Sequence, residues 1–476
     1  MSTGRKRPRG EVGSPAGDGS PRGRHDAFFA WLLGTTQREF FRHYFEKKPL
    51  HFSHGAATHF TEPHAALPAV RWSTELMLRL AAEKSLSHAT DVSVVRFDAA
   101  HKKRISFRSQ GTVTEEEMRC CMRKGWSVRF LRPQEYVAEN SAVLVLLEEI
   151  FGCFCGLNSY WTPANSQGFA PHYDDVDVFL LQLEGEKEWR LYDPPATVDV
   201  LSRHSSEDYA PEQLPKPKQT LRLVAGDVLY MPRGTVHQGR TYSHAHSLHV
   251  TFSANQMNAW ADLMKHAVTH VVEKLAANQI HWRRSLSRLL PKAMGAVHHP
   301  VLRAEAGLPP LTEQRQKRRR RLQSTFQQMA ADVFHHLCSE EVMDECCDMY
   351  VRETVAKQQP LPPSSVCGAQ RKAPVGINSI VRPRAPHCAR LVLAFAGEAR
   401  VYHCCGNSPV CLAAPEGLLR FEADFAPAIA TILAAPERGV RVSDLPFTAF
   451  DKVDDVRANQ LTLVEALRDA GILAVL

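Results

Sequence analysis

The sequence predicts a mainly β-stranded central domain, followed by a helical region and a small C-terminal α+β domain. Three patterns along its 476 residues lead to this fold class. Short segments of alternating polarity dominate residues 93–253, and apolar residues recur at helical spacing after residue 255. The last segment, residues 387–476, begins with strand patterns and ends with helical ones. Many short strands separated by turn residues indicate a jelly roll or barrel.

Composition places the chain among ordinary globular proteins, because 44% of its residues are hydrophobic and 23% are charged. No apolar run approaches the length of a membrane span, so we expect no membrane association. Residues 1–24 are polar and basic without the apolar centre of a secretory signal, and we expect a disordered basic tail there. A chain without an export signal stays in a reducing compartment, where its twelve cysteines are expected to be free thiols. The absence of a Cys-x-x-Cys pair argues against a structural zinc site.

The first folded segment, from residue 25, is expected to be helical before the strands begin. Its apolar stripe consists of Phe40, Phe41, Tyr44 and Phe45. The Lys48-Pro49 pair ends the helix, because the residue before a proline disfavours the helical conformation. We therefore predict one domain over residues 25–254, with a helical and strand extension at its N-terminus.

Within this domain, three strand patterns can be assigned to faces. Residues 176–183 and 188–192 are predicted to form a hairpin around Glu184-Gly185-Glu186. Residues 222–231 form a strand interrupted at Gly226-Asp227. In residues 246–253 the side chains alternate between two faces. Leu248, Val250 and Phe252 share one face, and His249, Thr251 and Ser253 share the other.

The C-terminal half divides into three predicted parts. Residues 255–357 form a helical region, whose residues 291–321 contain proline and arginine and are predicted to be an extended insertion. Residues 358–386 are rich in proline and serine and are predicted to be a linker. Residues 387–476 form the α+β domain, and Gly471 fits the end of its last helix.

A metal site is indicated by two short motifs that flank the predicted hairpin. His172 and Asp174 stand two positions apart, so on a strand they would point to one face. His237 follows a Pro-x-Gly turn and supplies a second imidazole. Two histidines and one carboxylate form the facial triad of non-haem Fe(II) oxygenases, and they leave positions open for a chelating co-substrate and O₂. His244, His246 and His249 are alternative third ligands.

Lys187 lies fifteen positions after His172, on the predicted face of Trp189 and Leu191. Inside a barrel this lysine would need an anionic partner to stay charged, and the distal carboxylate of 2-oxoglutarate would provide one. Thr251 could add a hydroxyl to the same carboxylate. The alternative interpretation is a solvated lysine beside a turn.

Five segments carry a resemblance to a known family. They are Asn158-Ser-Tyr-Trp-Thr-Pro, Asn165-Ser-Gln-Gly-Phe-Ala-Pro-His-Tyr-Asp-Asp with Leu181-Gln-Leu-Glu-Gly-Glu-Lys-Glu-Trp-Arg-Leu-Tyr, Gly226-Asp-Val-Leu-Tyr-Met-Pro-Arg-Gly-Thr-Val-His-Gln and His246-Ser-Leu-His-Val-Thr-Phe-Ser. With these motifs the chain resembles the JmjC ribosomal oxygenases, which are nucleolar 2-oxoglutarate-dependent protein histidyl hydroxylases. One member is also described as a histone lysine demethylase. The resemblance is strongest over residues 160–260 and extends more weakly to residues 39–49 and 401–446.

The resemblance implies a cupin-like JmjC double-stranded β-helix over residues 25–254, a helical dimerisation region over 255–357 and a winged-helix-like domain over 387–476. It implies that His172, Asp174 and His237 hold iron and that Lys187 binds 2-oxoglutarate. Asn158 matches a position near the co-substrate, and Tyr160 and Ser253 match positions that contact the target histidine. Trp161 departs from the family, where a smaller aliphatic residue stands.

The function expected from these observations is an Fe(II)- and 2-oxoglutarate-dependent protein oxygenase that uses O₂ and hydroxylates a histidine of a ribosomal protein. Histone lysine demethylation by the same chemistry is an alternative. A second alternative is a non-catalytic ribosome-assembly or chromatin factor, and a third is a cupin-like enzyme that acts on small molecules with zinc or manganese. A homodimer is expected. The basic tail and the run Lys317 to Arg321 favour a location in the nucleus and nucleolus, with RNA or pre-ribosome contact.

Overall fold

The computed structural model describes residues 21–64, 67–194, 200–361, 374–394, 397–408, 417–447 and 452–476. It divides into two compact units. Unit 1 comprises Met1–Met257 and Thr354–Leu476, and unit 2 comprises Asn258–Glu353. No helix in the described ranges is both long and apolar enough to cross a membrane. None of the ten cysteines within these ranges forms a disulfide.

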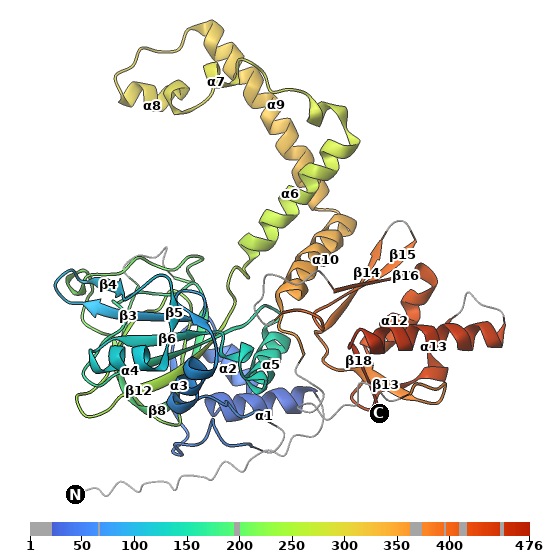
Figure 1. Ribbon diagram of the computed structural model, residues 1–476. Coiled ribbons are helices and arrows are strands. Elements are labelled where there is room, and N and C mark those ends of the chain that lie inside the picture. The colour runs from blue at the N-terminus through green and yellow to red at the C-terminus, as the bar shows by residue number, and fades with distance from the viewer. Residues whose placement is uncertain are drawn as a thin grey trace, which may run out of the picture. The chain divides into compact units, whose positions relative to one another are not determined.

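The centre of unit 1 is an antiparallel sheet of ten strands (Figure 1), which confirms the predicted mainly β core. Eight strands follow the order β1-β10-β8-β12-β7-β6-β3-β4, and β9 and β11 pair with β8 off this path. The strands are β1 (Leu50–Ser53), β3 (Val92–Asp98), β4 (Lys103–Ser106), β6 (Ser127–Leu131), β7 (Gly156–Thr162), β8 (Asp177–Tyr192), β9 (Gln219–Val224), β10 (Asp227–Met231), β11 (Val236–Arg240) and β12 (Ser247–Ala254). A separate pair joins β2 (Leu86–Ser87) to β5 (Thr112–Val113).

The predicted hairpin around Gly185 is wrong, because β8 runs unbroken from Asp177 to Tyr192. Gly185 has a φ of +62°, and a Cβ there would lie 1.9 Å from the backbone oxygen of His246. The glycine therefore bends the strand where another backbone crosses closely, without reversing its direction. As a result, the first half of β8 pairs with β10 and β12, and the second half pairs with β9 and β11.

Even-numbered residues of β8 face the barrel interior before the bend, and odd-numbered residues face it after the bend. Val178 and Leu180 face inward before the bend, and Trp189 and Leu191 face inward after it, within one buried cluster. The pairing of β8 with β12 skips Leu183, which is a β-bulge. A bulge adds one residue to one strand and so exchanges its two faces. This shift places Lys187 on the inner face together with Trp189, as predicted.

Helices cover the outer face of the sheet with a second apolar core. They are α1 (Pro21–Leu33), α2 (Gln37–His43), α3 (Thr74–Glu83), α4 (Glu115–Arg123) and α5 (Ser141–Phe151). Phe40 is fully buried in this core, and Phe41, Tyr44 and Phe45 pack against it, as their spacing predicts. Residues 21–24 of the predicted disordered tail belong to α1, and residues 1–20 lie outside the described residues. Pro at the first helical position suits such a start, since its missing N–H has no partner to lose.

The C-terminal part of unit 1 contains two small sheets and two longer helices. The sheets have the orders β17-β13-β18 and β14-β15-β16. The elements are β13 (Ile380–Pro383), β14 (Ala389–Ala394), β15 (Glu398–His403), β16 (Gly417–Glu422), β17 (Val440–Arg441), β18 (Leu473–Val475), α12 (Ala426–Leu433) and α13 (Val453–Asp469). Because β13 falls within residues 358–386, part of the predicted linker is a strand of this fold. Gln358 and Gln359 are buried as well, so the linker prediction is also wrong at its start.

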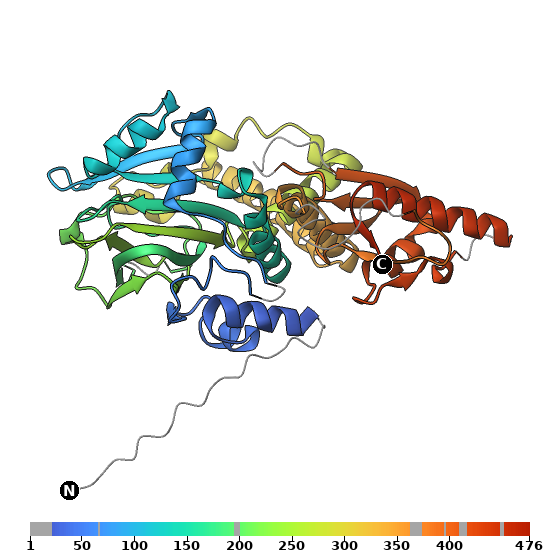
Figure 2. The same cartoon turned by 60° about the horizontal axis from the view of Figure 1, so that its bottom comes forward.

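Unit 2 is helical, with α6 (Trp260–Asn278) and α9 (Glu313–Leu337) side by side (Figures 1 and 2). The short helices α7 (Leu290–Ala293) and α8 (Pro300–Glu305) lie between them in the chain, and α10 (Glu340–Lys357) follows. Ala267, Val271 and Leu275 of α6 form a small core with Val342 and Cys346. The predicted extended insertion is wrong at its end, because Lys317 to Arg321 lie in α9. Long basic side chains are good helix formers, so this run continues a helix.

Candidate metal and co-substrate site

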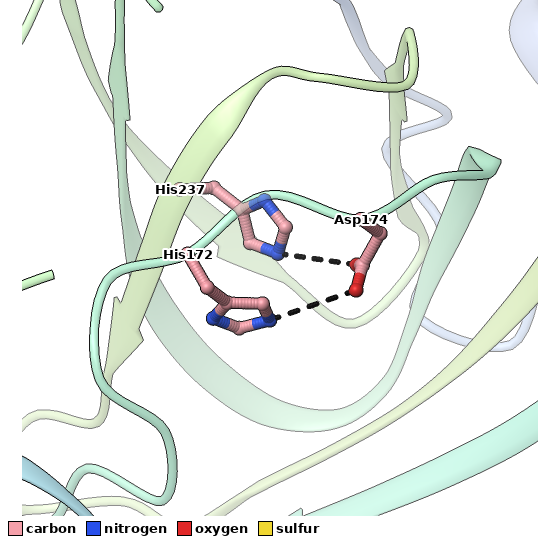
Figure 3. Close-up of side chains that lie close together, drawn as sticks. All are labelled: His172, Asp174 and His237. Atoms are coloured by element: carbon pink, nitrogen blue, oxygen red, sulfur yellow. Dashed lines mark ion pairs between the residues drawn. The ribbon is translucent and has the colours of Figure 1, made fainter. Parts of the chain in front are cut away.

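Three side chains converge at one point of the barrel (Figure 3). One ligand atom from each of His172, Asp174 and His237 lies within 4.8 Å of the other two. The Nε2 atom of His172 is 3.8 Å from Oδ1 of Asp174, and that of His237 is 3.7 Å from Oδ2. Ligands about 2.1 Å from one ion lie at most about 4.2 Å apart, so the carboxylate-to-imidazole spacing suits a shared metal.

Backbone contacts hold the two imidazoles in position. His172 and His237 form an antiparallel bridge, in which each N–H donates to the carbonyl of the other residue. The Nδ1 atom of His172 lies 2.8 Å from the carbonyl oxygen of Ala170, and that of His237 lies 2.9 Å from Thr235. A proton on Nδ1 satisfies both carbonyls and leaves the Nε2 lone pairs free to bind a metal.

The predicted strand over His172 and Asp174 is not regular. His172 takes part only in the isolated bridge, and Asp174 lies in the loop that leads into β8. The N–H of Gly234 donates to the carbonyl of Asp174 at 2.9 Å, which ties this loop to the turn before His237. The two side chains still converge, because this contact and the bridge fix the loop on both sides.

Burial tunes the protonation of the inner imidazole. The side chain of His237 is 9% exposed, whereas that of Asp174 is 36% exposed. Burial first, and the neighbouring His172 second, lower the pKa of His237 to about 4. A metal ligand must be neutral, so His237 is ready to bind a cation at physiological pH. The donor set of two imidazoles and one carboxylate fits Fe(II).

Lys187 is a buried cation without an acidic partner. It is 5% exposed, and among the described residues its Nζ donates to the hydroxyl of Thr162 at 3.1 Å and forms no ion pair. The Nζ atom also lies 5.0 Å from the ring centre of Trp189. Burial lowers the pKa of Lys187 to about 7. Such a group gains its full charge when an anion enters beside it.

The triad and Lys187 line the same cavity of about 270 Å³. Its wall is built from both halves of β8 and from the neighbouring strands β6, β7, β10, β11 and β12. The lining includes Arg129, Tyr160, Phe169, His172, Asp174, Val178, Leu180, Lys187, Trp189, Met231, His237, Gly239, His249 and Thr251. A metal-chelating dicarboxylate needs a metal site for one end and a cation for the other end. One cavity therefore contains the residues for both.

Tyr160 stands in the wall in contact with two residues that the sequence did not single out for this role. Its ring stacks on that of His249 at 4.9 Å with an angle of 7°. Burial, first of all, raises the pKa of Tyr160, and Arg129 opposes that shift through charge and a hydrogen bond. The Nε atom of Arg129 is buried without a partner in the described structure. These groups present polar atoms to whatever enters the cavity.

The predicted co-substrate and substrate residues fall into two groups. Tyr160 and Thr251 line the cavity with the triad and Lys187. Asn158 and Ser253 are half-buried and do not belong to the lining. Asn158 pairs with Thr251 across β7 and β12, and Ser253 pairs with Gly156 further along. Both lie on the strand faces that carry Tyr160 and Thr251 toward the cavity.

The alternative third ligands do not join the metal site. His244 and His246 are exposed and pair with Glu186 and Glu184. His249 is 2% exposed in the cavity wall, but it is not part of the triad. Burial, followed by the nearby charges of Lys187 and His237, lowers the pKa of His249 well below its usual value.

Sequence reasoning missed Thr162, Gly239 and Arg129. It placed His249 on one strand face with Thr251, but only as an alternative metal ligand and not as the residue that stacks on Tyr160. Gly239 lies in β11, and a Cβ there would stand 2.8 Å from Cε of Lys187. The glycine therefore leaves room for the lysine to cross the barrel. No sequence signal identifies Thr162, because its contact with Lys187 joins two separate strands.

Comparisons with known proteins place this geometry in a family context. Residues 129–263 match the JmjC domain. The bifunctional lysine-specific demethylase and histidyl-hydroxylase NO66 of Culex quinquefasciatus is 35% identical over 272 residues, which are 57% of this chain and 40% of that protein. Ribosomal oxygenase 1 of Danio rerio is 34% identical over 266 residues, 56% of this chain and 47% of that protein. The chain thus spans less than half the length of each of these two relatives.

A solved structure of YcfD, a ribosomal oxygenase from Escherichia coli in complex with cobalt and 2-oxoglutarate, aligns with 93% of this chain and 99% of its own. The TM-score is 0.49 and the sequence identity is 14%. A likeness of this degree carries no argument about the chemistry of the present site, which rests on its own residues.

Proposed function

Because the chain belongs to the JmjC ribosomal oxygenase family, we propose that it is an Fe(II)- and 2-oxoglutarate-dependent protein oxygenase. We propose further that it uses O₂ to hydroxylate a histidine side chain of a ribosomal protein. The observation that carries this proposal is the position of Lys187. Among the residues that the structure describes, Lys187 is buried without a carboxylate partner, and it shares one cavity with a His-Asp-His cluster. A metal-chelating dicarboxylate satisfies both features at once.

In this proposal His172, Asp174 and His237 hold the iron. Bound iron supplies the oxidising chemistry that couples decarboxylation of 2-oxoglutarate to hydroxylation of the substrate. The backbone carbonyls of Ala170 and Thr235 fix the imidazole tautomers, so that both Nε2 atoms point to the ion.

Lys187 binds the distal carboxylate of 2-oxoglutarate, with the hydroxyl of Thr251 beside it in the wall. Thr162 holds the lysine Nζ in place before the co-substrate arrives. Asn158 of β7 pairs with Thr251 of β12, and we propose that it contacts the co-substrate next to Thr251. Val178, Leu180 and Met231 exclude water from the same cavity.

Tyr160 and Ser253 are proposed to bind the target side chain. The Tyr160 ring is fixed by its stack on His249 and by an edge contact with Phe169, whose ring centre is 5.6 Å away. Its hydroxyl stays protonated at neutral pH, because burial raises the pKa, and it can donate a hydrogen bond to an imidazole nitrogen of the target.

Histone lysine demethylation is a second candidate function, since NO66 of Culex quinquefasciatus carries both activities in its name. The same iron and co-substrate serve both reactions, so pocket contacts decide between them. A non-catalytic assembly or chromatin factor is disfavoured, because a scaffold has no use for a buried unpaired lysine beside a metal-ligand cluster. A small-molecule enzyme with zinc or manganese has no use for Lys187 either.

The proposal is tested by succinate release from 2-oxoglutarate by the purified full chain, with ribosomal-protein and histone peptides offered in parallel. We expect release that depends on added iron and on a ribosomal-protein peptide, which gains 16 mass units at histidine. Loss of methyl groups from a histone peptide instead would support the second candidate. No release with either peptide, and none uncoupled, would overturn the enzymatic proposal.

His172→Ala and Asp174→Ala are the matched variants for this assay. Each should abolish iron binding and succinate release while thermal unfolding stays cooperative, because the backbone bridge between residues 172 and 237 does not need either side chain. His244→Ala is the control, since that imidazole is exposed and away from the triad. Turnover near the wild-type level in either triad variant would remove the iron assignment.

Further parts of the chain are assigned by the same proposal. The helices α6 and α9 would form a homodimer interface, and the fold of β13, β17, β18, α12 and α13 would be a winged-helix-like domain. The protein would work in the nucleus and nucleolus in ribosome biogenesis, and as a chromatin regulator if histones prove to be substrates. Its basic segments would contact RNA or pre-ribosomes.

Deleting residues 1–24 should shift a fluorescent fusion toward the cytoplasm, because the basic tail is proposed to direct nuclear accumulation. An unchanged nuclear signal would show that the tail does not direct it.

A further inference from the structure

The positive charge of the chain is concentrated in one segment of unit 2. Residues 281–321 contain eleven lysines and arginines against two acidic residues, a net charge of +9, whereas the whole chain carries +7. The remainder of the chain is therefore slightly acidic. This concentration of positive charge in one segment indicates that the segment binds an anionic partner.

The centre of this segment is a cation face on α9, formed by Lys317, Arg318, Arg320 and Arg321. All four side chains are exposed. Arg319, between them, is half-buried and donates from Nη1 to the carbonyl of Ala293 at 3.2 Å. That bond fixes the side of α9 that faces α7, and the 3.6-residue period turns the other four cations away from α7. Figure 1 shows α7 beside the first turns of α9.

None of the four cations has an acidic partner. Among the described residues, no carboxylate forms an ion pair with any lysine or arginine of residues 281–321. On the cation face, positions 317 and 321 are four apart and positions 318 and 321 are three apart, and like charges at these spacings destabilise a helix. The helix therefore tolerates an unfavourable arrangement that a bound polyanion would relieve.

The surroundings of the cation face discriminate between polyanions. By the same helical period, Gln314, Ser324, Thr325 and Gln328 extend this face, and all are exposed and uncharged. A helix that binds a membrane surface would instead place apolar residues along its contact face. The basic run also lies inside a 25-residue helix, whereas a receptor for an extended basic peptide would have to unwind it.

The cation face lies in a stretch without the aromatic rings that binding to a single strand needs. Residues 283–321 contain no Phe, Tyr or Trp, and Trp282 just before them is half-buried. Binding to unpaired bases relies on stacking against aromatic side chains. Arg284, Arg288 and Lys292 lie just before or within α7 and are exposed. They supply more cations near α9, which suits a phosphate backbone.

We propose that the cation face of α9 binds the phosphate backbone of double-stranded RNA. The choice of RNA rests on the proposed function, because a ribosomal-protein substrate is found beside folded ribosomal RNA. The contact is electrostatic and independent of sequence, and it positions the enzyme on its target without taking part in the oxidation. A duplex is favoured because its phosphates form a rigid array that the fixed helix can match.

The test is fluorescence anisotropy of a labelled RNA hairpin with the full chain, over a range of salt concentrations. The quadruple variant Lys317→Gln, Arg318→Gln, Arg320→Gln, Arg321→Gln removes the cation face, and glutamine keeps the helix because it is a good helix former. We expect at least about a tenfold loss of affinity near 0.1 M salt. The slope of log affinity against log salt should fall by roughly three units, since each lost phosphate contact removes about 0.9.

A matched control removes four exposed cations from unit 1 through Arg38→Gln, Arg79→Gln, Arg123→Gln and Lys124→Gln. It has the same net charge as the first variant and should keep nearly all of the wild-type affinity and salt slope. Replacing the three arginines of the cation face with lysine should also preserve most binding, because phosphate contacts need charge above all. Circular dichroism of both quadruple variants checks that α9 remains helical.

Equal binding by the wild type and the cation-face variant would overturn the proposal. So would an equal loss in the control, which would show that net charge alone matters. Tighter binding to single-stranded RNA, to a DNA duplex or to vesicles of phosphatidylcholine with phosphatidylserine would assign the face to another partner and also overturn it. The assay needs neither iron nor 2-oxoglutarate. Failure here therefore leaves the oxygenase proposal intact, and failure of succinate release leaves the RNA affinity measured here unchanged.

Discussion

In the proposed function, Lys187 is the side chain that links the fold to co-substrate binding. The barrel holds it on its inner face with a threonine hydroxyl and a tryptophan ring as neighbours. Its burial disfavours the ammonium form, so the free protein retains a lysine whose pKa is about 7. We expect a lysine in this environment to bind an anion, because a nearby negative charge stabilises its ammonium form.

Lys187→Ala should therefore weaken 2-oxoglutarate selectively. A hydrogen bond between charged groups contributes roughly 1.5–3 kcal/mol, and about 1.4 kcal/mol corresponds to tenfold. We expect the apparent 2-oxoglutarate constant in the succinate assay to rise roughly ten- to a hundredfold, while iron affinity stays nearly unchanged. Lys187→Arg should restore only part of the loss, because a planar guanidinium does not replace a compact ammonium. An unchanged apparent 2-oxoglutarate constant in Lys187→Ala would show that Lys187 does not bind the co-substrate.

Binding of 2-oxoglutarate should also take up a proton at Lys187. At pH 8 the free lysine, with a pKa of about 7, is mostly neutral. A carboxylate beside it raises the pKa back toward 10.5 and so draws about one proton from the buffer. Calorimetric titration of iron-loaded protein without oxygen, in two buffers of different ionisation enthalpy, measures this number. The uptake should vanish in Lys187→Met, and a persistent uptake in that variant would assign the proton to another group.

The lowered pKa of Lys187 also makes the free energy of unfolding depend on pH. The folded lysine loses its proton near pH 7, whereas the unfolded one keeps it up to 10.5. Between these values the unfolded chain binds more protons, so the free energy of unfolding rises with pH across this window. Lys187→Met should remove that part of the pH dependence in urea unfolding measured without co-substrate. An equal pH dependence in both proteins would contradict the buried environment of Lys187.

At the scale of elements, the site depends on the long strand β8 and its bend. The first half carries Val178 and Leu180 into the cavity, and the second half carries Lys187 and Trp189. Gly185 allows the strand to bend past the carbonyl of His246. A hairpin at this place would reverse the chain, whereas the observed bend lets β8 pair with β10 and β12 before it and with β9 and β11 after it.

Gly185→Ala should destabilise unit 1 more than an ordinary glycine substitution does. The added Cβ would combine left-handed strain with a clash against backbone, which cannot move aside as a flexible side chain can. We expect the free energy of unfolding to fall by about 2–4 kcal/mol in urea denaturation. Gly152→Ala is the matched control, since its φ of +65° is nearly the same and no atom lies within 4 Å. Its loss should be about 1 kcal/mol, and equal losses in both variants would contradict the role of the close crossing.

At the scale of the whole molecule, unit 2 exposes more apolar surface than a monomeric helical region usually does. Trp260 in α6 is 82% exposed, and Phe326 and Phe334 in α9 are 73% and 68% exposed. Exposed aromatic side chains of this size mark interaction surfaces. The cation face of α9 ends at Arg321, five residues before Phe326, so this helix changes from charged to apolar along its length.

We expect the full chain to be a homodimer through α6 and α9. Light scattering at micromolar concentration should give twice the mass of one chain. The double variant Trp260→Glu, Phe326→Glu should give the mass of one chain and retain the thermal unfolding of unit 1. A monomeric wild type would reject the prediction, and so would a double variant that remains dimeric.

The sequence by itself predicted the chemistry that we propose for this protein. The residue types and spacing of His172, Asp174, His237 and Lys187, together with the alternation in residues 246–253, were sufficient to predict a β barrel with a metal and an anion site. These signals are local, because a strand has a fixed period and a metal has fixed ligand preferences.

The tertiary structure decided what depends on contacts between distant segments. It replaced the hairpin by the bent strand β8, because whether a glycine reverses a strand or bends it depends on the backbone that crosses it. It placed Thr162 and Gly239 around the lysine through strand pairings that no spacing along the chain reveals. It also turned the basic run of residues 317–321 from an extended insertion into part of a helix. The bond from Arg319 to Ala293, 26 residues away, then separates Arg319 from the four cations on the other side of that helix.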